Sequence, residues 1–300
     1  MLRIAFSPIY KYQLPEGHRF PMAKYELLPE QLLYEGTARE SQFFAPDRLD
    51  EDTILLTHTV EYWDKLQNQK LSRKEERAIG FPMRPELVER GRYIAQGTIQ
   101  CALYARQYGV AMNIAGGTHH AFADRGEGFC VFNDFAIAAN YLLAEGGVRQ
   151  ILIVDLDVHQ GNGTAHIFRD EPRVFTFSMH GARNYPTRKE RSDLDIGLPD
   201  KTEDEPYLKT LYNTLPRLLH ELQPDLVCYL AGVDVLATDK LGRLSMSIEG
   251  CKARDRFVFE QCKGHGIPVA VSMGGGYSER IAHIVEAHAN TFRMAEEVFF

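Results

Sequence analysis

The sequence predicts one α/β domain over residues 1–300, with a central, mostly parallel β-sheet covered by helices on both faces. Two observations predict this fold class. Short apolar runs such as Ile151–Val154 and Val227–Leu230 show no polar alternation, which is typical of parallel strands buried on both faces. Longer segments with helical periodicity separate these runs, and no Ser/Gly/Pro-rich linker, internal repeat or low-complexity tract divides the chain.

Strands are predicted where four to six residues rich in Val, Ile and other apolar side chains stand between turn residues. In chain order they fall at residues 3–6, 53–56, 110–114, 150–155, 173–178, 226–230 and 268–272. Helices are predicted where apolar residues recur every three or four positions. They fall at residues 23–35, 60–69, 86–108, 133–145, 164–168, 207–222, 251–264 and 278–299.

Composition excludes several classes of protein. The net charge is −7, and no dense block of Lys and Arg offers the basic patch of a nucleic-acid-binding protein. The apolar runs are far too short to span a membrane, and Pro8 interrupts any signal-peptide pattern, so we expect a cytoplasmic protein with no membrane partner. The five cysteines are odd in number and form no CxxC pair, which argues against a disulfide framework or a thiolate zinc site.

Polar residues gather where the predicted strands end. Ligands bind at the carboxyl ends of the strands in a parallel sheet, so these clusters mark a candidate site. Five strand ends contribute to it: Gly116–His120, Asp155–His159, Ser178–His180, Asp234 and Gly274–Tyr277. Solubility alone does not explain this placement.

Asp155, Asp157 and His159 have the spacing i, i+2, i+4, which directs all three side chains to one side of an extended chain. Asp157 and His159 can then share a metal ion, with Asp155 beneath them and Asp234 completing the ligand set from a neighbouring strand. Three protein ligands leave a fourth position open, as in catalytic zinc sites. Two Asp and one His also suit Fe²⁺. The competing interpretation is a strand end whose carboxylates are simply solvated.

His119, His120 and Tyr277 are candidates for proton transfer and oxyanion binding. A neutral imidazole can accept a proton from an attacking water at neutral pH. The Gly274–Gly276 run lacks the Lys-Ser/Thr pair of a P-loop. It lets backbone pass close to the site and presents the Tyr277 hydroxyl to a developing oxyanion. For each group taken alone, a plain surface or packing role is the competing interpretation.

Taken together, these segments resemble the histone deacetylase family within the arginase–deacetylase fold. The matching stretches occur in the family's order: Ala115–His120, Gly128–Asp134, Asp155–Gly163, Phe177–His180, Ala231–Asp234 and Gly274–Tyr277. The Pro15–Met22 segment and the His159–Gly163 stretch are most similar to the class IV branch and its bacterial relatives. The resemblance covers nearly the whole chain.

The resemblance implies a division of roles within the site. The ligands of a zinc ion would be Asp157, His159 and Asp234. The residues that handle the proton and the oxyanion would be His120 as general base and then general acid, His119 as an electrostatic aid, and Tyr277 as hydrogen-bond donor to the amide carbonyl.

The resemblance also implies a substrate tunnel and a second ion. Phe129, with Gly128 beside it, would wall a narrow tunnel for the lysine side chain, and Tyr185 would form the opposite wall. A structural K⁺ would lie beneath the zinc. The side chains of Asp155 and Ser178 would hold it, together with backbone carbonyls that include that of Met179.

Three positions depart from the class I pattern. Thr118 stands where many class I members carry a bulkier residue, which implies a wider inner pocket. Asn162 stands where they carry an Asp behind the second histidine, and an Asn can orient His120 without adding a negative charge. Pro82 falls near the place of a rim Asp that grips the substrate backbone, so peptide binding is expected to differ.

The predicted function is that of a zinc-dependent amidohydrolase that removes acetyl or longer acyl groups from lysine side chains of proteins or peptides. One alternative is a deacetylase of small acylated amines such as acetylpolyamines. Another is a non-catalytic acyl-lysine-binding protein, against which the intact set of site residues argues. A binuclear manganese ureohydrolase is disfavoured because Gly161 stands where its metal pair needs an Asp. The sequence predicts neither the acyl-chain length nor the oligomeric state.

Overall fold

A computed structural model describes residues 1–300 and contains one sheet of eight strands, in which every pair of neighbours is parallel. The strand order is β2-β1-β3-β8-β7-β4-β5-β6. The strands are β1 Arg3–Ala5, β2 Phe43–Phe44, β3 Val110–Asn113, β4 Ile151–Asp155, β5 Val174–Gly181, β6 Leu194–Leu198, β7 Leu226–Leu230 and β8 Val269–Ser272. The predicted single α/β domain is confirmed, and its sheet is wholly parallel.

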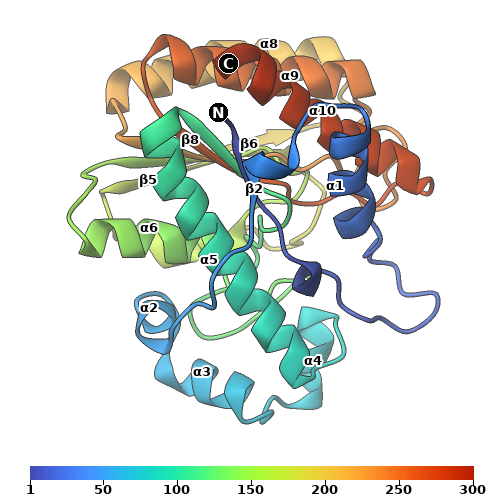
Figure 1. Ribbon diagram of the computed structural model, residues 1–300, viewed down its shortest axis with the longest axis vertical. Helices are drawn as coiled ribbons and strands as arrows, with labels where there is room; N and C mark the ends of the chain where they lie inside the picture. The colour runs from blue at the N-terminus through green and yellow to red at the C-terminus, as the bar shows by residue number, and fades with distance from the viewer.

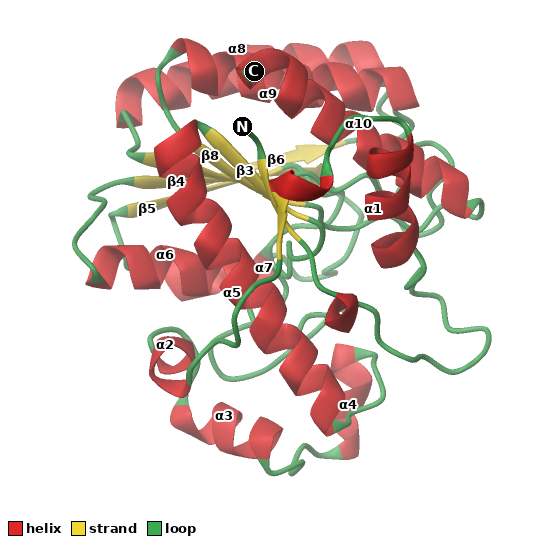
Figure 2. Cartoon of the chain, in the orientation of Figure 1, coloured by secondary structure: helices red, strands yellow, loops and turns green.

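Helices form a layer on each face of this sheet (Figures 1 and 2). The ten α-helices are α1 Lys24–Tyr34, α2 Glu51–Leu55, α3 Val60–Gln67, α4 Arg73–Ile79, α5 Pro85–Tyr108, α6 Asp134–Ala144, α7 Asn162–Phe168, α8 Asp204–Leu222, α9 Ile248–Gly264 and α10 Ile281–Phe299. Helices α8, α9 and α10 lie on one face with α1 beside α10, and α5, α6 and α7 lie on the other. Helices α2, α3 and α4 lie beyond the sheet, near the first half of α5.

Each central strand contributes to two apolar cores, because successive side chains of a strand point to opposite faces. Ile153 of β4 packs in a cluster with Phe135 of α6, whereas its neighbour Val154 belongs to a larger cluster with Phe259 of α9. This two-sided burial explains why the strands lack polar alternation. All five cysteines are buried free thiols. None of the helices combines the length and the apolar character needed to cross a membrane.

The order of the strands brings the candidate site together. After β3 the chain moves to β4 and builds outward through β5 and β6, and β7 and β8 later fill the gap between β4 and β3. The carboxyl ends of β3, β8, β7 and β4 are therefore neighbours, and the loops that follow them converge on one edge of the sheet.

Six of the seven predicted strands and all eight predicted helices are present, with ends shifted by at most three residues. The strand predicted at residues 53–56 is wrong, because this segment belongs to helix α2. The Asp50 carboxylate accepts a hydrogen bond from the Thr53 backbone N–H at 2.7 Å and caps the helix. Two acidic residues in the first turn also favour a helix start, and together these effects outweigh the β-propensity of the apolar run.

Besides α2, one further helix and two strands were absent from the sequence prediction. Helix α4 is almost entirely charged, so it has no apolar periodicity; a capping box between Ser72 and Glu75 starts it, and Gly80 in the left-handed conformation ends it. Strand β6 is an edge strand with alternating exposure and an internal glycine, and β2 has only two residues. Neither strand shows the continuous apolar run on which the prediction depended.

A buried ion pair supports the loops of the site from behind. Arg254 and Asp255 of α9 are fully buried, with 2.8 Å between the Arg254 Nε and an Asp255 carboxylate oxygen. The guanidinium also donates at 2.7 Å to the carbonyl of Gly232, in the loop after β7. Asp255 accepts further hydrogen bonds from Tyr229 and Thr291. This network joins β7, α9 and α10.

We expect Asp255→Ala to destabilise the fold by about 3–5 kcal/mol, because it leaves the Arg254 cation buried without its partner. Urea denaturation followed by circular dichroism measures the change in the free energy of unfolding. The matched control is Glu297→Ala, which removes the partner of Arg256 at the surface and should change little. Equal losses in the two variants would contradict the assigned importance of the buried pair.

Candidate active site

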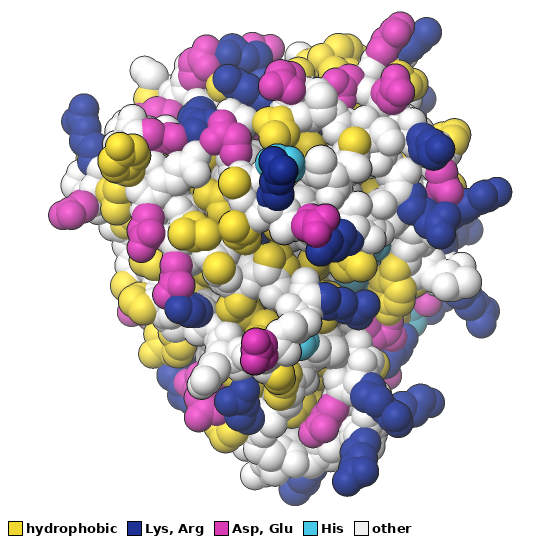
Figure 3. Space-filling view, turned by 90° about the vertical axis from the view of Figure 1, so that its right-hand side faces the viewer, with side chains coloured by type: hydrophobic (Ala, Val, Ile, Leu, Met, Phe, Trp, Pro, Cys, Tyr) yellow, Lys and Arg dark blue, Asp and Glu magenta, His cyan; other side chains and the backbone are white.

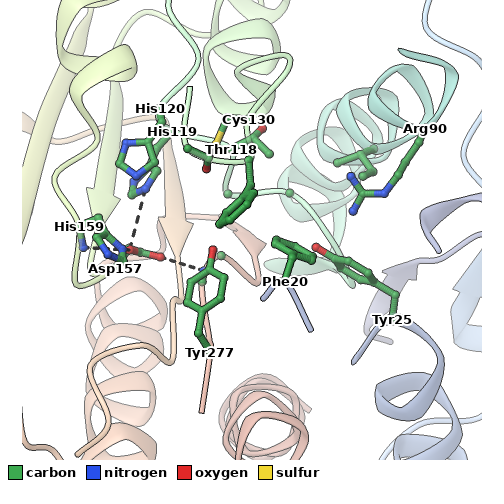
Figure 4. A pocket seen from close by; sticks show the side chains of 17 residues that line it. Phe20, Tyr25, Arg90, Thr118, His119, His120, Cys130, Asp157, His159 and Tyr277 are labelled. Atoms are coloured by element: carbon green, nitrogen blue, oxygen red, sulfur yellow. Dashed lines mark hydrogen bonds and ion pairs between the residues drawn. The ribbon is translucent and has the colours of Figure 1, made fainter. Parts of the chain in front are cut away.

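Asp157, His159 and Asp234 converge where the loops after β4 and β7 meet, and Figure 4 shows the first two of them side by side. The His159 Nδ1 lies 3.0 Å from the Asp157 Oδ1 and 3.2 Å from the Asp234 Oδ2. One ligand atom from each residue lies within 4.8 Å of the others. The three residues predicted as metal ligands are thus brought together in a geometry that can hold one ion.

The local backbone differs from the one assumed for the sequence prediction. Strand β4 ends at Asp155, and Asp157 and His159 lie in bends and not in extended chain. The expectation that an extended strand aligns all three side chains is therefore wrong beyond Asp155. They converge instead because Asp155 accepts a hydrogen bond from the Asp157 N–H at 3.1 Å, and Asp157 accepts one from the His159 N–H at 2.9 Å.

Backbone N–H groups hold the two carboxylates in place. Asp234 accepts from the Val158 N–H at 2.9 Å, and Asp157 accepts from the Gly275 N–H at 2.8 Å. A Cβ atom at position 275 would collide with the Asp234 carboxylate, so only glycine permits this approach. The glycine run after β8 thus brings backbone close to the site, as the sequence predicts.

The charge balance of the triad fits a metal cation. Asp157, His159 and Asp234 are 1%, 8% and 0% exposed, and the Asp234 Oδ2 makes no well-formed hydrogen bond, although the His159 Nδ1 lies 3.2 Å away. Burial and the neighbouring Asp157 carboxylate raise the pKa of Asp234 to about 7. A divalent cation would satisfy the unpartnered oxygen and offset both buried charges, and this donor set suits Zn²⁺ and Fe²⁺.

His119 is placed to carry a positive charge. Its Nδ1 lies 2.7 Å from the Asp155 Oδ2, and its Nε2 lies 3.9 Å from the Asp157 Oδ1. Burial disfavours the charged imidazole, but the carboxylates of Asp155 and Asp157 outweigh burial and raise the pKa of His119 to about 9. Asp155 thus serves first as the partner of this histidine.

His120, in contrast, is held in its neutral form. Its ring lies 4.1 Å from that of His119, and burial together with the charges of His119 and His159 lowers its pKa well below the ordinary value. The His120 Nδ1–H donates to the Asn162 Oδ1 at 2.6 Å, which leaves Nε2 free to accept a proton. At neutral pH the two adjacent histidines therefore differ in charge.

Aromatic side chains form the passage to the triad. The ring of Phe129 lies 6.0 Å from that of Tyr277 and 5.2 Å from that of Phe20, and Tyr185 lies edge-on to His120 at 4.9 Å. Figure 4 shows the Tyr277 hydroxyl pointing into the pocket. Burial and the nearby carboxylates raise the pKa of Tyr277 well above its ordinary value, so the phenol keeps its proton.

Gly128 and Thr118 shape the inner end of the passage. A Cβ at position 128 would lie 2.6 Å from the His120 ring, so glycine is required for the loop to pass over this histidine. The Thr118 hydroxyl is turned away to donate to Asp134 at 2.8 Å. The cavity that these residues line has a volume of about 40 Å³, so the small threonine does not by itself open a long inner channel.

Ser178 and Met179 lie within β5, in register with the end of β4, where Ser178 pairs with Asp155. Both are buried, and the Ser178 hydroxyl lies 2.9 Å from the His180 Nδ1. They are thus close to Asp155, as the predicted potassium site requires. The K⁺ ion itself stays a prediction.

Three carboxylates that position site residues were given no role from sequence. Asp134 accepts hydrogen bonds from the backbone N–H groups of Gly117 and Thr118 at 3.1 and 2.8 Å, and so fixes the loop before the two histidines. Asp239 accepts from the Tyr277 N–H. Glu127 accepts from the Tyr185 hydroxyl at 2.7 Å. Only Asp134 had a sequence signal, since it ends one of the stretches that resemble the family.

An α/β fold with a buried Asp/His/Asp triad beside one protonated and one neutral histidine defines a protein suited to metal-assisted hydrolysis. The model of the histone deacetylase domain matches residues 18–292. An uncharacterised protein of Picosynechococcus sp. is 44% identical over 99% of both chains. Histone deacetylase 2 of Arabidopsis thaliana is 30% identical over 89% of this chain and 72% of its own.

The fold comparison agrees. A crystal structure of a histone deacetylase homologue in complex with SAHA has a TM-score of 0.84 and 24% identity, and covers 99% of this chain and 84% of its own. The chain belongs to the histone deacetylase family, as its sequence motifs predict. The individual roles of its site residues stay predictions.

We expect Asn162→Asp to raise the pKa of His120, because a carboxylate in place of the amide stabilises the imidazolium. The acidic limb of the pH dependence of kcat/KM should then move to higher pH, since a general base works only when deprotonated. The basic limb serves as the internal control. An unchanged acidic limb would show that position 162 does not tune this histidine.

Metal binding should compete with protons at two ligands. The Asp157 and Asp234 carboxylates outweigh burial and raise the pKa of His159 to about 10 without metal, and the pKa of Asp234 is about 7. Each ligand must lose its proton to bind. The logarithm of the apparent Zn²⁺ affinity should rise by about one per pH unit between these values, and more steeply below pH ~7. Competition with a chelator across pH measures this slope, and a flat profile would contradict the ligand set.

Proposed function

We propose that the protein is a metal-dependent amidohydrolase that removes acyl groups from the lysine side chains of proteins or peptides. The observation that carries the proposal is the arrangement around the triad. A neutral His120 and a protonated Tyr277 both border the space beside the triad, at the inner end of an aromatic passage. Membership of the histone deacetylase family supports the same class of reaction.

Zn²⁺ or Fe²⁺ held by Asp157, His159 and Asp234 would supply the Lewis acidity that activates a water and polarises the acyl carbonyl. His120 accepts the proton of the attacking water at Nε2, because its Nδ1 is engaged by Asn162. The same Nε2–H then donates its proton to the departing lysine nitrogen, which cannot leave as an anion. The products are a carboxylate and a free amine.

Tyr277 and His119 control the charges of the reacting groups. The phenol donates a hydrogen bond to the carbonyl oxygen as negative charge develops there. The protonated His119, fixed by Asp155, adds a positive charge next to His120 and keeps that histidine neutral in the resting site.

The dimensions of the site favour a lysine side chain that carries a short acyl group. The aromatic walls of Phe129, Tyr185 and Tyr277 suit the apolar methylenes of lysine. The inner cavity of about 40 Å³ holds roughly three water-sized groups, which is close to the size of an acetyl group. A fatty acyl chain would need Thr118 and its neighbours to move.

Hydrolysis of three substrates tests the proposal: an acetyl-lysine peptide, a myristoyl-lysine peptide and an acetylpolyamine, each with metal-loaded protein. We expect the acetyl-lysine peptide to be turned over fastest, and a hydroxamate chelator to abolish the reaction. Tyr277→Phe should lower kcat by about 10²–10³-fold, because it removes one donor to the oxyanion. The variant should keep its metal content.

Each result has a distinct meaning. No turnover of any substrate by metal-loaded protein would contradict the hydrolase proposal and leave acyl-lysine binding as the alternative. Faster hydrolysis of the acetylpolyamine would indicate that the substrates are small acylated amines. Full activity of Tyr277→Phe would remove this residue from the mechanism.

A further inference from the structure

The mouth of the passage is unusually basic for a protein with a net charge of −7. Its opening has a volume of about 580 Å³ and lies between Phe129, Tyr185 and Tyr277. Among the residues that line it, four are arginines and one is a carboxylate: Arg19, Arg77, Arg183, Arg243 and Glu127. The charge of this opening is therefore opposite in sign to that of the whole chain.

The few carboxylates nearby leave most of this positive charge uncompensated. Glu127 already lies 3.0 Å from Arg125 and accepts from the Tyr185 hydroxyl. Arg183 and Arg243 share the single carboxylate of Asp200, at 3.9 and 2.9 Å. One carboxylate, that of Asp200, thus compensates two guanidinium groups at the mouth.

The other two arginines have no carboxylate partner within 4.0 Å. Arg77 makes one hydrogen bond, from its Nε to a backbone carbonyl in its own helix, α4. Arg19 lies over the ring of Phe129, with 5.0 Å from its Cζ to the ring centroid. Its loop lies on the face shown in Figure 3, where Lys and Arg side chains gather toward the lower right. Both guanidinium groups keep free donors beside the wall of the passage.

We infer that these arginines select acyl-lysine substrates whose neighbouring residues are acidic. The inference rests on the proposed function, since it takes the mouth as the entry of the lysine side chain. With the acyl-lysine inserted, the flanking peptide lies across the opening, where Asp or Glu side chains meet the guanidinium groups. The same charges disfavour a polycationic substrate such as an acetylpolyamine, because like charges repel at the entrance.

The carboxylates that the arginines recognise belong to the peptide flanks and not to the acyl chain. The arginines surround the opening, whereas the passage below it is walled by Phe20, Phe129 and Tyr277. A carboxylate at the end of an acyl chain would pass these rings and reach Asp157 and Asp234. Burial and like charge would both oppose it there.

Binding of three matched peptides tests the inference. Each peptide carries a methyl-ketone isostere of acetyl-lysine, which cannot be hydrolysed, flanked on both sides by Asp, by Ala or by Lys. Fluorescence anisotropy with metal-loaded protein gives Kd for each. We expect the Asp-flanked peptide to bind about tenfold more tightly than the Ala-flanked one at low salt, and about twofold at 0.5 M NaCl. The Lys-flanked peptide should bind most weakly.

Variants separate charge from packing. The double variant Arg19→Gln, Arg77→Gln should reduce the preference for Asp flanks to about threefold or less at low salt. Arg19→Lys keeps the charge but loses the planar contact with Phe129, and should retain the preference. The matched control is Arg149→Gln, which should leave the preference for Asp flanks unchanged. Arg149 is exposed and precedes β4 at the opposite end of the sheet.

The outcomes distinguish this inference from the proposed function. Equal Kd values for Asp and Ala flanks, or a preference that the double variant leaves intact, would overturn the inference even if acyl-lysine peptides are hydrolysed. Charge-dependent binding without hydrolysis of any natural acyl-lysine peptide would support the inference and overturn the proposed reaction. A preference for succinyl-lysine over acetyl-lysine peptides with Ala flanks would place the recognised carboxylate on the acyl chain and contradict it.

Discussion

The burial of three carboxylates at one edge of the sheet is the constraint on which the rest of the site depends. Asp155, Asp157 and Asp234 are all at most 3% exposed. Isolated buried carboxylates are costly, so each needs a cation, an imidazole or several N–H donors. The protein supplies all three kinds of compensation: backbone N–H groups, two protonatable histidines and a space that fits a metal ion. The same need explains the glycines of this region, because backbone N–H groups can approach the carboxylates this closely only where no side chain intervenes.

The same constraint separates the two adjacent histidines. His119 shares a hydrogen bond with a carboxylate and His120 shares one with an amide, and this difference, together with burial, favours a protonated His119 beside a neutral His120. The charge of His119 reinforces the difference, since a protonated His119 makes protonation of His120 harder. The proposed mechanism uses one cation and one proton acceptor, and two identical side chains, 4.1 Å apart between ring centres, would supply both.

The sequence was most informative where local chemistry decides structure. The buried strands and long helices were predicted because their apolar patterns are continuous, and the triad because strand ends of a parallel sheet meet. The strand predicted at residues 53–56 was wrong because capping by Asp50, a single side chain, decides that segment. The sequence could not reveal the roles of Asp239 and Glu127, since each carboxylate accepts a hydrogen bond from a residue at least 38 positions away. It could not reveal the arginines of the mouth either, because only the folded chain brings them to one surface. The alignment of Asp157 and His159 was predicted for the wrong reason, since bends and not extended chain produce it.

The strand order also has a consequence for biosynthesis. Strands β7 and β8 occupy the middle of the sheet but come last in the chain, and Asp234 and Tyr277 follow them. While the ribosome is still making the first 225 residues, β3 and β4 have no neighbour between them, and a nascent chain can offer at most two of the three predicted metal ligands. Domains that depend on such distant pairings fold slowly. Binding of a metal ion by all three predicted ligands would therefore have to wait for the end of synthesis, when the last strands close the sheet and complete the site.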